Sequence, residues 1–143
     1  MKKVITYGTF DYFHYGHYNL LKRAKALGDY LIVGVSSDEL CRQKGKITIL
    51  DEKTRMDIVK DLKFVDEVII ENSMEQKCFD VKASHVDIFV LGSDYSEVFP
   101  KMPEYKELLK MNCEVVFLER TKDISTTQLK NKLLEQLNTT KKY

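Results

Sequence analysis

The chain has 143 residues, of which 43% are apolar and 31% are charged, a composition typical of one folded domain and unlike that of disordered or collagen-like chains. Its 23 basic and 22 acidic residues give a net charge of +1, which excludes a general basic surface for DNA or RNA, so any phosphate must be bound by a local cluster. No apolar run is long enough to cross a membrane and the start at Met1–Val4 does not resemble a signal peptide, so we expect a single cytoplasmic domain over residues 1–143.

Short apolar runs alternate with segments of helical period in the first third of the chain. Val4–Tyr7 is expected to form a strand that ends at Gly8, and leucine and alanine side chains at helical spacing predict a helix over residues 20–27. Tyr30–Val35 is almost continuously apolar, as are strands that are covered on both faces, and Glu39–Arg42 follows it as a short helix. This alternation is typical of βαβ units.

The same alternation continues through the rest of the chain. The expected elements are, in order, a flexible loop at Lys44–Lys46, a helix capped by Asp51, a strand at Val65–Ile70, a helix near Met74–Ser84, a strand at Ile88–Leu91, a proline-containing loop at Val98–Tyr105, a helix near Tyr105–Met111, a strand at Glu114–Leu118, a last helix after Thr126 and a tail at 138–143 that we expect to fray. Five strands alternating with helices predict an α/β fold, a Rossmann-like doubly wound sheet of about five parallel strands with helices on both faces.

The unusual polar clusters of the sequence come directly after a predicted strand or shortly beyond one. These clusters are Gly8–His17, Lys44 with Lys46, Gly92–Asp94 and Glu119–Thr127. Because doubly wound sheets bind ligands beyond the carboxyl ends of their strands, we expect these clusters to form one composite site.

The first cluster contains a pair of histidines, His14 and His17, at a spacing that places both rings on one side of a first helical turn. Backbone N–H groups and the dipole at a helix start attract anions, and imidazole N–H donors beside them can stabilise the charge that grows on phosphate oxygens during group transfer. Gly16 would allow the backbone to approach a ligand closely. The pattern therefore indicates a phosphate site after the first strand.

Two other interpretations of the histidine pair remain open. The rings could bind zinc, although no Cys or Asp stands at a suggestive spacing, or they could be structural, since histidines are often partly buried. The sequence has no G-x-x-x-x-G-K-[ST] loop and no G-x-G-x-x-G fingerprint, which excludes a Walker P-loop and argues against NAD or FAD. Cys41, Cys78 and Cys113 are far apart, which favours reduced thiols over a zinc ribbon or a disulfide framework.

A second cluster joins the fifth strand to the last helix. It reads Arg-Thr-Lys-Asp-Ile-Ser-Thr-Thr over residues 120–127, and in it Arg120 can bind a phosphate through two parallel hydrogen bonds while the hydroxyls can cap a helix or receive an oxyanion. Taken alone, such hydroxyls are most often helix caps, and Lys44 and Lys46 are most often solvated surface. Their common place beyond the strands makes them site candidates.

Together these residues resemble a known family. Gly8-Thr9-Phe10-Asp11 followed by His14-x-Gly-His17, with Arg120-Thr-x-x-Ile-Ser-Thr-Thr127, is similar to the cytidylyltransferases of the nucleotidyltransferase superfamily. The resemblance covers nearly the whole chain. The H-x-G-H element marks the superfamily, and its combination with R-T-x-x-I-S-T-T marks the cytidylyl branch.

The resemblance implies a reaction in which an alcohol phosphate, with sn-glycerol 3-phosphate expected first, attacks CTP in line and gives a CDP-alcohol and pyrophosphate. The residues implied for catalysis are His14, His17, Lys44, Lys46 and Arg120. Those implied for CTP binding are Thr9, Phe10, Gly16, Asp94, Arg120, Thr121, Ile124, Ser125 and Thr126. Those implied for acceptor binding are Asp11, Lys44, Lys46, Arg55, Lys63 and Lys77.

The resemblance also implies Mg²⁺ as the cofactor, bound mainly by the CTP phosphates and not by dedicated protein ligands, together with a homodimer and a role in teichoic acid or capsule biosynthesis. No nucleic acid or membrane partner is expected. The chain departs from the family pattern on the acceptor side: it lacks a Trp in segment 72–75, has Lys63 in place of an Arg, and differs over Tyr95–Pro100. Ribitol, erythritol, choline and ethanolamine phosphates therefore remain open as acceptors, and a non-catalytic nucleotide-binding module is a further interpretation.

Overall fold

A single parallel sheet organises the chain, of which the computed structural model describes residues 1–121 and 131–137. Five strands of this described part lie in the order β3-β2-β1-β4-β5. The strands are β1 (Lys3–Gly8), β2 (Tyr30–Ser36), β3 (Glu67–Glu71), β4 (Ile88–Gly92) and β5 (Glu114–Leu118). The chain builds outward from β1 first to one edge and then to the other, so the predicted α/β, doubly wound sheet is confirmed.

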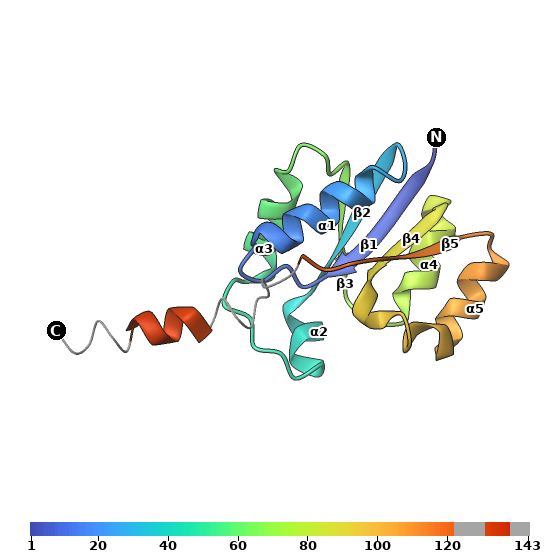
Figure 1. Cartoon of the computed structure of the whole chain (residues 1–143). Coiled ribbons are helices and arrows are strands. Elements are labelled where there is room, and N and C mark those ends of the chain that lie inside the picture. The colour runs from blue at the N-terminus through green and yellow to red at the C-terminus, as the bar shows by residue number, and fades with distance from the viewer. Residues whose placement is uncertain (122–130, 138–143) are drawn as a thin grey trace.

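Helices cover both faces of the sheet (Figure 1). They are α1 (Tyr15–Lys25), α2 (Asp38–Gln43), α3 (Glu52–Lys60), α4 (Gln76–Ser84) and α5 (Pro103–Lys110), with short 3₁₀ turns η1 (Ser93–Tyr95) and η2 (Phe99–Lys101). On one face α1 and α3 bury Leu21 and Val59, and on the other α4 and α5 bury Val81 and Leu108. Each such burial stabilises the fold by about 1.5–3 kcal/mol, so the two apolar clusters hold the sheet between the helix layers.

Two helices begin earlier than their apolar period predicts. The period of α1 starts near residue 20, yet the helix begins at Tyr15 because His14 caps it. The predicted loop at Val98–Tyr105 contains η2 and the start of α5, which begins at Pro103. Proline suits a first helical position because its missing N–H would have no intrahelical partner there.

The last expected helix is described only over residues 131–137, which are helical. Its predicted start after Thr126 and the tail at 138–143 lie outside the described residues, and a single domain over residues 1–143 stays a prediction. Among residues 1–121 and 131–137, no helix has the length and apolar character needed to span a bilayer.

Candidate active site

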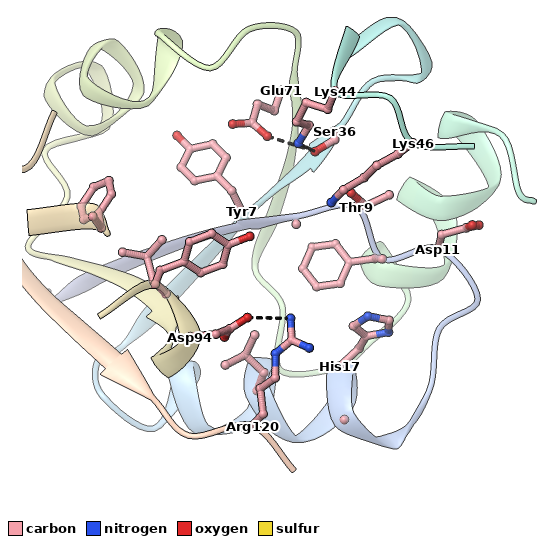
Figure 2. A pocket seen from close by; sticks show the side chains of 18 of the residues that line it. Tyr7, Thr9, Asp11, His17, Ser36, Lys44, Lys46, Glu71, Asp94 and Arg120 are labelled. Carbon is pink, nitrogen blue, oxygen red and sulfur yellow. Dashed lines mark hydrogen bonds and ion pairs between the residues drawn. The ribbon is translucent and has the colours of Figure 1, made fainter. Parts of the chain in front are cut away.

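A cavity of about 550 Å³ lies at the carboxyl edge of the sheet, beyond the ends of the strands (Figure 2). Predicted site residues that line it are Thr9, Phe10, Asp11, His14, Gly16, His17, Lys44, Lys46, Lys77, Asp94, Arg120 and Thr121. The predicted CTP contacts Ile124, Ser125 and Thr126 lie outside the described residues. The structure therefore brings the polar clusters that follow β1, β2 and β4, and the start of the one that follows β5, around one space.

His14 and His17 together cap the start of α1. His14 is the N-cap, and its Nδ1 accepts a hydrogen bond from the backbone N–H of Gly16 at 3.0 Å. The Nδ1 of His17 accepts one from the backbone N–H of His14 at 3.2 Å, and the two rings stack with centroids 3.9 Å apart. This is a capping box in which imidazoles replace the usual hydroxyl and carboxylate, so the H-x-G-H spacing also serves local folding.

The capping box fixes which ring nitrogen carries the proton. A neutral imidazole that accepts through Nδ1 is protonated on Nε2. Burial, with the neighbouring His14 and Arg120, lowers the pKa of His17 to about 4, and burial and Arg120 also lower the pKa of His14. At neutral pH both rings are therefore uncharged Nε2–H donors, which suits phosphate oxygens.

The turn between β1 and α1 is shaped by an aromatic ring. Phe10 is buried with φ of 54°, and its ring lies so close to Gly8 that an added Cβ there would be 2.8 Å from the ring. Gly8 is therefore required by this close approach. The Phe10 ring also meets the His17 ring at 5.5 Å in an edge-to-face arrangement, so Phe10, predicted as a CTP contact, positions a histidine.

Lys44 and Lys46 reach the cavity from an ordered helix end and not from the flexible loop that was predicted. Gly45 has φ of 74°, its N–H donates to the Arg42 carbonyl at 3.0 Å, and the Lys46 N–H donates to the Cys41 carbonyl at 2.8 Å. This pattern is a Schellman motif, in which glycine supplies the left-handed residue after the helix. The side chain of Lys46 points into the cavity in Figure 2.

Asp11 holds the segment that follows these lysines. Its carboxylate accepts the backbone N–H groups of Ile49 at 2.9 Å and Leu50 at 3.0 Å, and only 4% of Asp11 is exposed. In Figure 2 this carboxylate points away from the cavity centre. Asp11 was predicted as an acceptor contact, and its geometry is that of a residue that positions Lys46.

A buried polar network that the sequence analysis missed lies beside Lys44. The Lys44 ammonium is 3.5 Å from the Ser36 hydroxyl, which donates to the Glu71 carboxylate at 3.0 Å. Glu71 also forms a buried ion pair with Lys77, and burial together with the nearby Lys46 lowers the pKa of Lys44. Ser36 and Glu71 are the last residues of β2 and β3, so a polar residue ending an apolar strand was the available signal.

Arg120 and Asp94 pair at 3.1 Å on the side of the cavity opposite Lys44 (Figure 2). Both side chains are about half exposed, and exposed pairs contribute about 0–1 kcal/mol, so a phosphate can displace Asp94 from Arg120 at little cost. The Asn19 amide donates to the Thr121 hydroxyl at 3.2 Å, which ties the segment after β5 to α1.

Two predicted acceptor contacts are not brought to the cavity. Arg55 is fully buried, and its guanidinium donates to the Thr9 and Ser36 carbonyls at 2.8 and 2.7 Å and to the Asp38 carboxylate at 2.8 Å. Arg55 therefore holds the carboxyl ends of β1 and β2 in place through these hydrogen bonds. Lys63 is exposed in the turn before β3, at the edge of the sheet opposite the cavity.

The described residues do not form a cluster of protein ligands for a metal ion. Residues 1–121 and 131–137 contain no group of three or more His, Cys, Asp or Glu side chains arranged to hold a metal ion. The cavity lining combines cations and neutral N–H donors with several separate carboxylates, which are Asp11, Glu71, Asp94, Glu104 and Glu119.

Comparison with known proteins gives consistent matches over most of the chain. A family model described as cytidylyltransferase-like matches residues 5–132. Glycerol-3-phosphate cytidylyltransferase of Bacillus spizizenii is 51% identical over 130 residues, covering 91% of this chain and 95% of the relative, and that of Staphylococcus aureus is 45% identical over 133 residues, covering 93% and 96%. A crystal structure of a lipopolysaccharide core biosynthesis protein from Thermoplasma volcanium matches with a TM-score of 0.68 at 34% identity, covering 87% of this chain and 99% of that one.

Proposed function

This chain belongs to the cytidylyltransferase-like family, and we propose that it transfers the cytidylyl group of CTP to sn-glycerol 3-phosphate, releasing CDP-glycerol and pyrophosphate. One observation supports the proposal above the others. The Nε2–H donors of His14 and His17 and the cations of Lys44, Lys46 and Arg120 surround one cavity at the carboxyl edge of the sheet. Neutral donors beside cations suit a triphosphate that must be bound and then cleaved.

The proposed reaction is a direct displacement. An oxygen of the acceptor phosphate forms a new bond to the α-phosphorus of CTP, while the bond to the bridging oxygen breaks and its electron pair leaves with pyrophosphate. No side chain is bonded covalently to the nucleotide. Holding the two substrates in line can supply about 7–11 kcal/mol of the barrier, and the protein's other task is to stabilise charge.

The donors divide this task by position. His14 and His17, fixed by the capping box, donate to the oxygens on which charge develops as pyrophosphate leaves, and one such donor is worth about 2.7–4 kcal/mol. Thr9 and Arg120 bind the triphosphate from the ends of β1 and β5. Lys46 approaches the α-phosphate from the helix end after β2.

The acceptor phosphate is assigned to the opposite side of the cavity. Lys44 and Lys77 both line the cavity there, and both contact the buried Ser36–Glu71 pair, which holds their ammonium groups in place. Glu71 offsets one of their two positive charges, and the remaining positive charge attracts the acceptor phosphate. Asp11 acts in this scheme by positioning the lysine-bearing segment.

We propose Mg²⁺ as the cofactor, arriving with CTP. A magnesium ion usually keeps several waters and is held by one or two carboxylates together with substrate phosphates, and the Asp94 carboxylate that faces Arg120 fits that role. When bound, the ion neutralises charge on the triphosphate.

The test is release of pyrophosphate with each of the four common nucleoside triphosphates, with and without sn-glycerol 3-phosphate. We expect release only with CTP and the acceptor together, and His14→Ala should lower kcat by about 10²–10³-fold through loss of a transition-state donor. Ribitol, erythritol, choline and ethanolamine phosphates are the alternative acceptors. CTP binding by calorimetry without product from any acceptor would overturn the enzyme proposal in favour of a nucleotide-binding module.

Three further parts of the proposal concern the setting of the reaction. We expect a homodimer, for which light scattering should give a mass near twice 16.7 kDa. We expect the protein in the cytoplasm, where CTP is available. CDP-glycerol would then serve teichoic acid or capsule biosynthesis as an activated donor of glycerol phosphate.

A further inference from the structure

One carboxylate oxygen of a cavity-lining residue, Glu104, has no hydrogen-bond donor among the described residues. Glu104 lines the cavity, its Oε2 is buried, and no residue in the described part of the chain donates a hydrogen bond to this atom. An unpaired carboxylate oxygen removed from water costs free energy, so native proteins rarely retain one without a use.

Helix capping does not explain this oxygen. Glu104 lies in the first turn of α5, where the helix dipole favours a negative charge. The N-terminus of α5 nevertheless has no side-chain cap hydrogen bond, so the carboxylate does not cap its own helix. Glu104 is instead one of the residues that line the cavity.

Glu104 lies on the acceptor side of the cavity. Its backbone carbonyl is 3.8 Å from the Sγ of Cys78, the residue that follows Lys77 on α4. The neighbouring lining from η2 and the residue after it is apolar, with Phe99 and Met102. The histidines proposed to bind the triphosphate lie at the start of α1, which covers the other face of the sheet (Figure 1).

We infer that Glu104 determines acceptor specificity by accepting a hydrogen bond from a hydroxyl of the polyol part of the acceptor. The inference rests on the proposed function. When the acceptor phosphate is bound by Lys44 and Lys77, the glycerol part extends away from these cations. We place it beside Glu104, which lines the same cavity. Glycerol offers only hydroxyl groups there, and an apolar surround strengthens a hydroxyl–carboxylate hydrogen bond.

Glu104→Gln tests the inference in the full chain, with CTP saturating and the acceptor varied. A hydrogen bond to a charged group is worth about 1.5–3 kcal/mol, so we expect kcat/KM for sn-glycerol 3-phosphate to fall by about 10- to 100-fold. The KM for CTP should stay unchanged. Propyl phosphate has no alcohol hydroxyl, so kcat/KM for this acceptor should fall little in Glu104→Gln. The ratio of kcat/KM for glycerol phosphate to that for propyl phosphate should therefore fall by about 10- to 100-fold.

Stability separates this role from a structural one. Removing a buried unpaired charge should leave the melting temperature of Glu104→Gln unchanged or raised, whereas loss of a structural contact would lower it. Glu107→Gln is the matched control, because Glu107 is an exposed carboxylate one turn further along α5 that does not line the cavity. It should behave as wild type in every assay.

Each other outcome has a distinct meaning. Equal losses with glycerol and propyl phosphates, or a raised KM for CTP, would overturn the assignment to an acceptor hydroxyl. Ethanolamine phosphate as the best acceptor, with the largest loss in Glu104→Gln, would make Glu104 an ammonium contact and would also overturn it. A wild-type protein without turnover on any acceptor refutes the proposed function itself. In that case calorimetry with sn-glycerol 3-phosphate still decides whether Glu104 binds it, and equal affinities of the wild type and Glu104→Gln would overturn the inference.

Discussion

Acidification should destabilise the fold through His17. The folded protein lowers the pKa of this ring from 6.5 to about 4, because the ring is buried and lies near His14 and Arg120. A base whose pKa is lower in the folded state is protonated preferentially in the unfolded chain. The contribution of His17 to the free energy of unfolding is therefore fully present well above pH 6.5 and is lost as the pH falls through 6.5 towards 4. At about pH 5 the pH is about 1.5 units below the unfolded pKa, which at 1.36 kcal/mol per unit gives a loss of about 2 kcal/mol.

The assay is urea unfolding at about pH 7.5 and about pH 5, comparing the wild type with His17→Asn. Asparagine offers an acceptor oxygen near the position of Nδ1 but does not titrate, so the pH-dependent loss should be about 2 kcal/mol smaller in the variant than in the wild type. His14 and the carboxylates titrate in both proteins and largely cancel in the comparison. The same variant should be nearly inactive, because it lacks the Nε2–H donor.

His85→Asn is the control for this measurement. His85 is the exposed C-cap of α4 with φ of 53°, a conformation that asparagine also adopts readily. We expect its pH-dependent loss to match that of the wild type. If His17→Asn lost as much stability on acidification as the wild type, the argument from the lowered pKa of the buried His17 ring would be refuted.

Two further predictions concern residues that hold the site in place. Gly45→Ala should lower the free energy of unfolding by about 1–2 kcal/mol, and Gly45→Asn should lower it by less, because asparagine adopts the left-handed conformation more readily than alanine. No atom lies within 4 Å of an added Cβ, so the cost comes from the backbone conformation alone. Equal urea midpoints for the two variants would contradict the assignment of a Schellman motif. Arg55→Met should lower the free energy of unfolding, measured in urea, by about 3–5 kcal/mol, because it removes hydrogen bonds to buried carbonyls and to Asp38. Lys53→Met, on the exposed side of the same helix, is the control and should change that free energy by less than about 0.5 kcal/mol.

The fold was predictable because its signals are local. Tyr30–Val35 and Ile88–Leu91 are short apolar runs bounded by polar residues or glycine, and the structure has strands at both. The start of α1 was harder to place, since its first turn carries no apolar period and is defined by His14 as the N-cap. A histidine is an unusual N-cap, so ordinary capping rules do not find it.

Much of the site was predictable because its residues follow strands in sequence, directly or beyond a short helix. Thr9 and Asp94 come directly after strand ends and line the cavity as expected. Arg55 shows the limit of this reasoning, because a cation on a helix can face a ligand or a neighbouring carbonyl, and the packing of α3 against β1 and β2 decides which. Glu104 carries no sequence signal at all, since its place depends on where α5 begins after two short 3₁₀ turns.

The construction of the site implies that its two sides differ in how readily they can change. His14 and His17, the proposed triphosphate donors, are part of the helix cap, so replacing either should perturb the start of α1 as well as the proposed chemistry. On the proposed acceptor side, Glu104 lies in the first turn of α5, after η1 and η2 and outside any strand. Substitutions there alter the cavity wall without disturbing a strand or a cap. The structural cost of a new acceptor is therefore smaller than that of a new nucleotide, and changes of specificity should concentrate between β4 and β5.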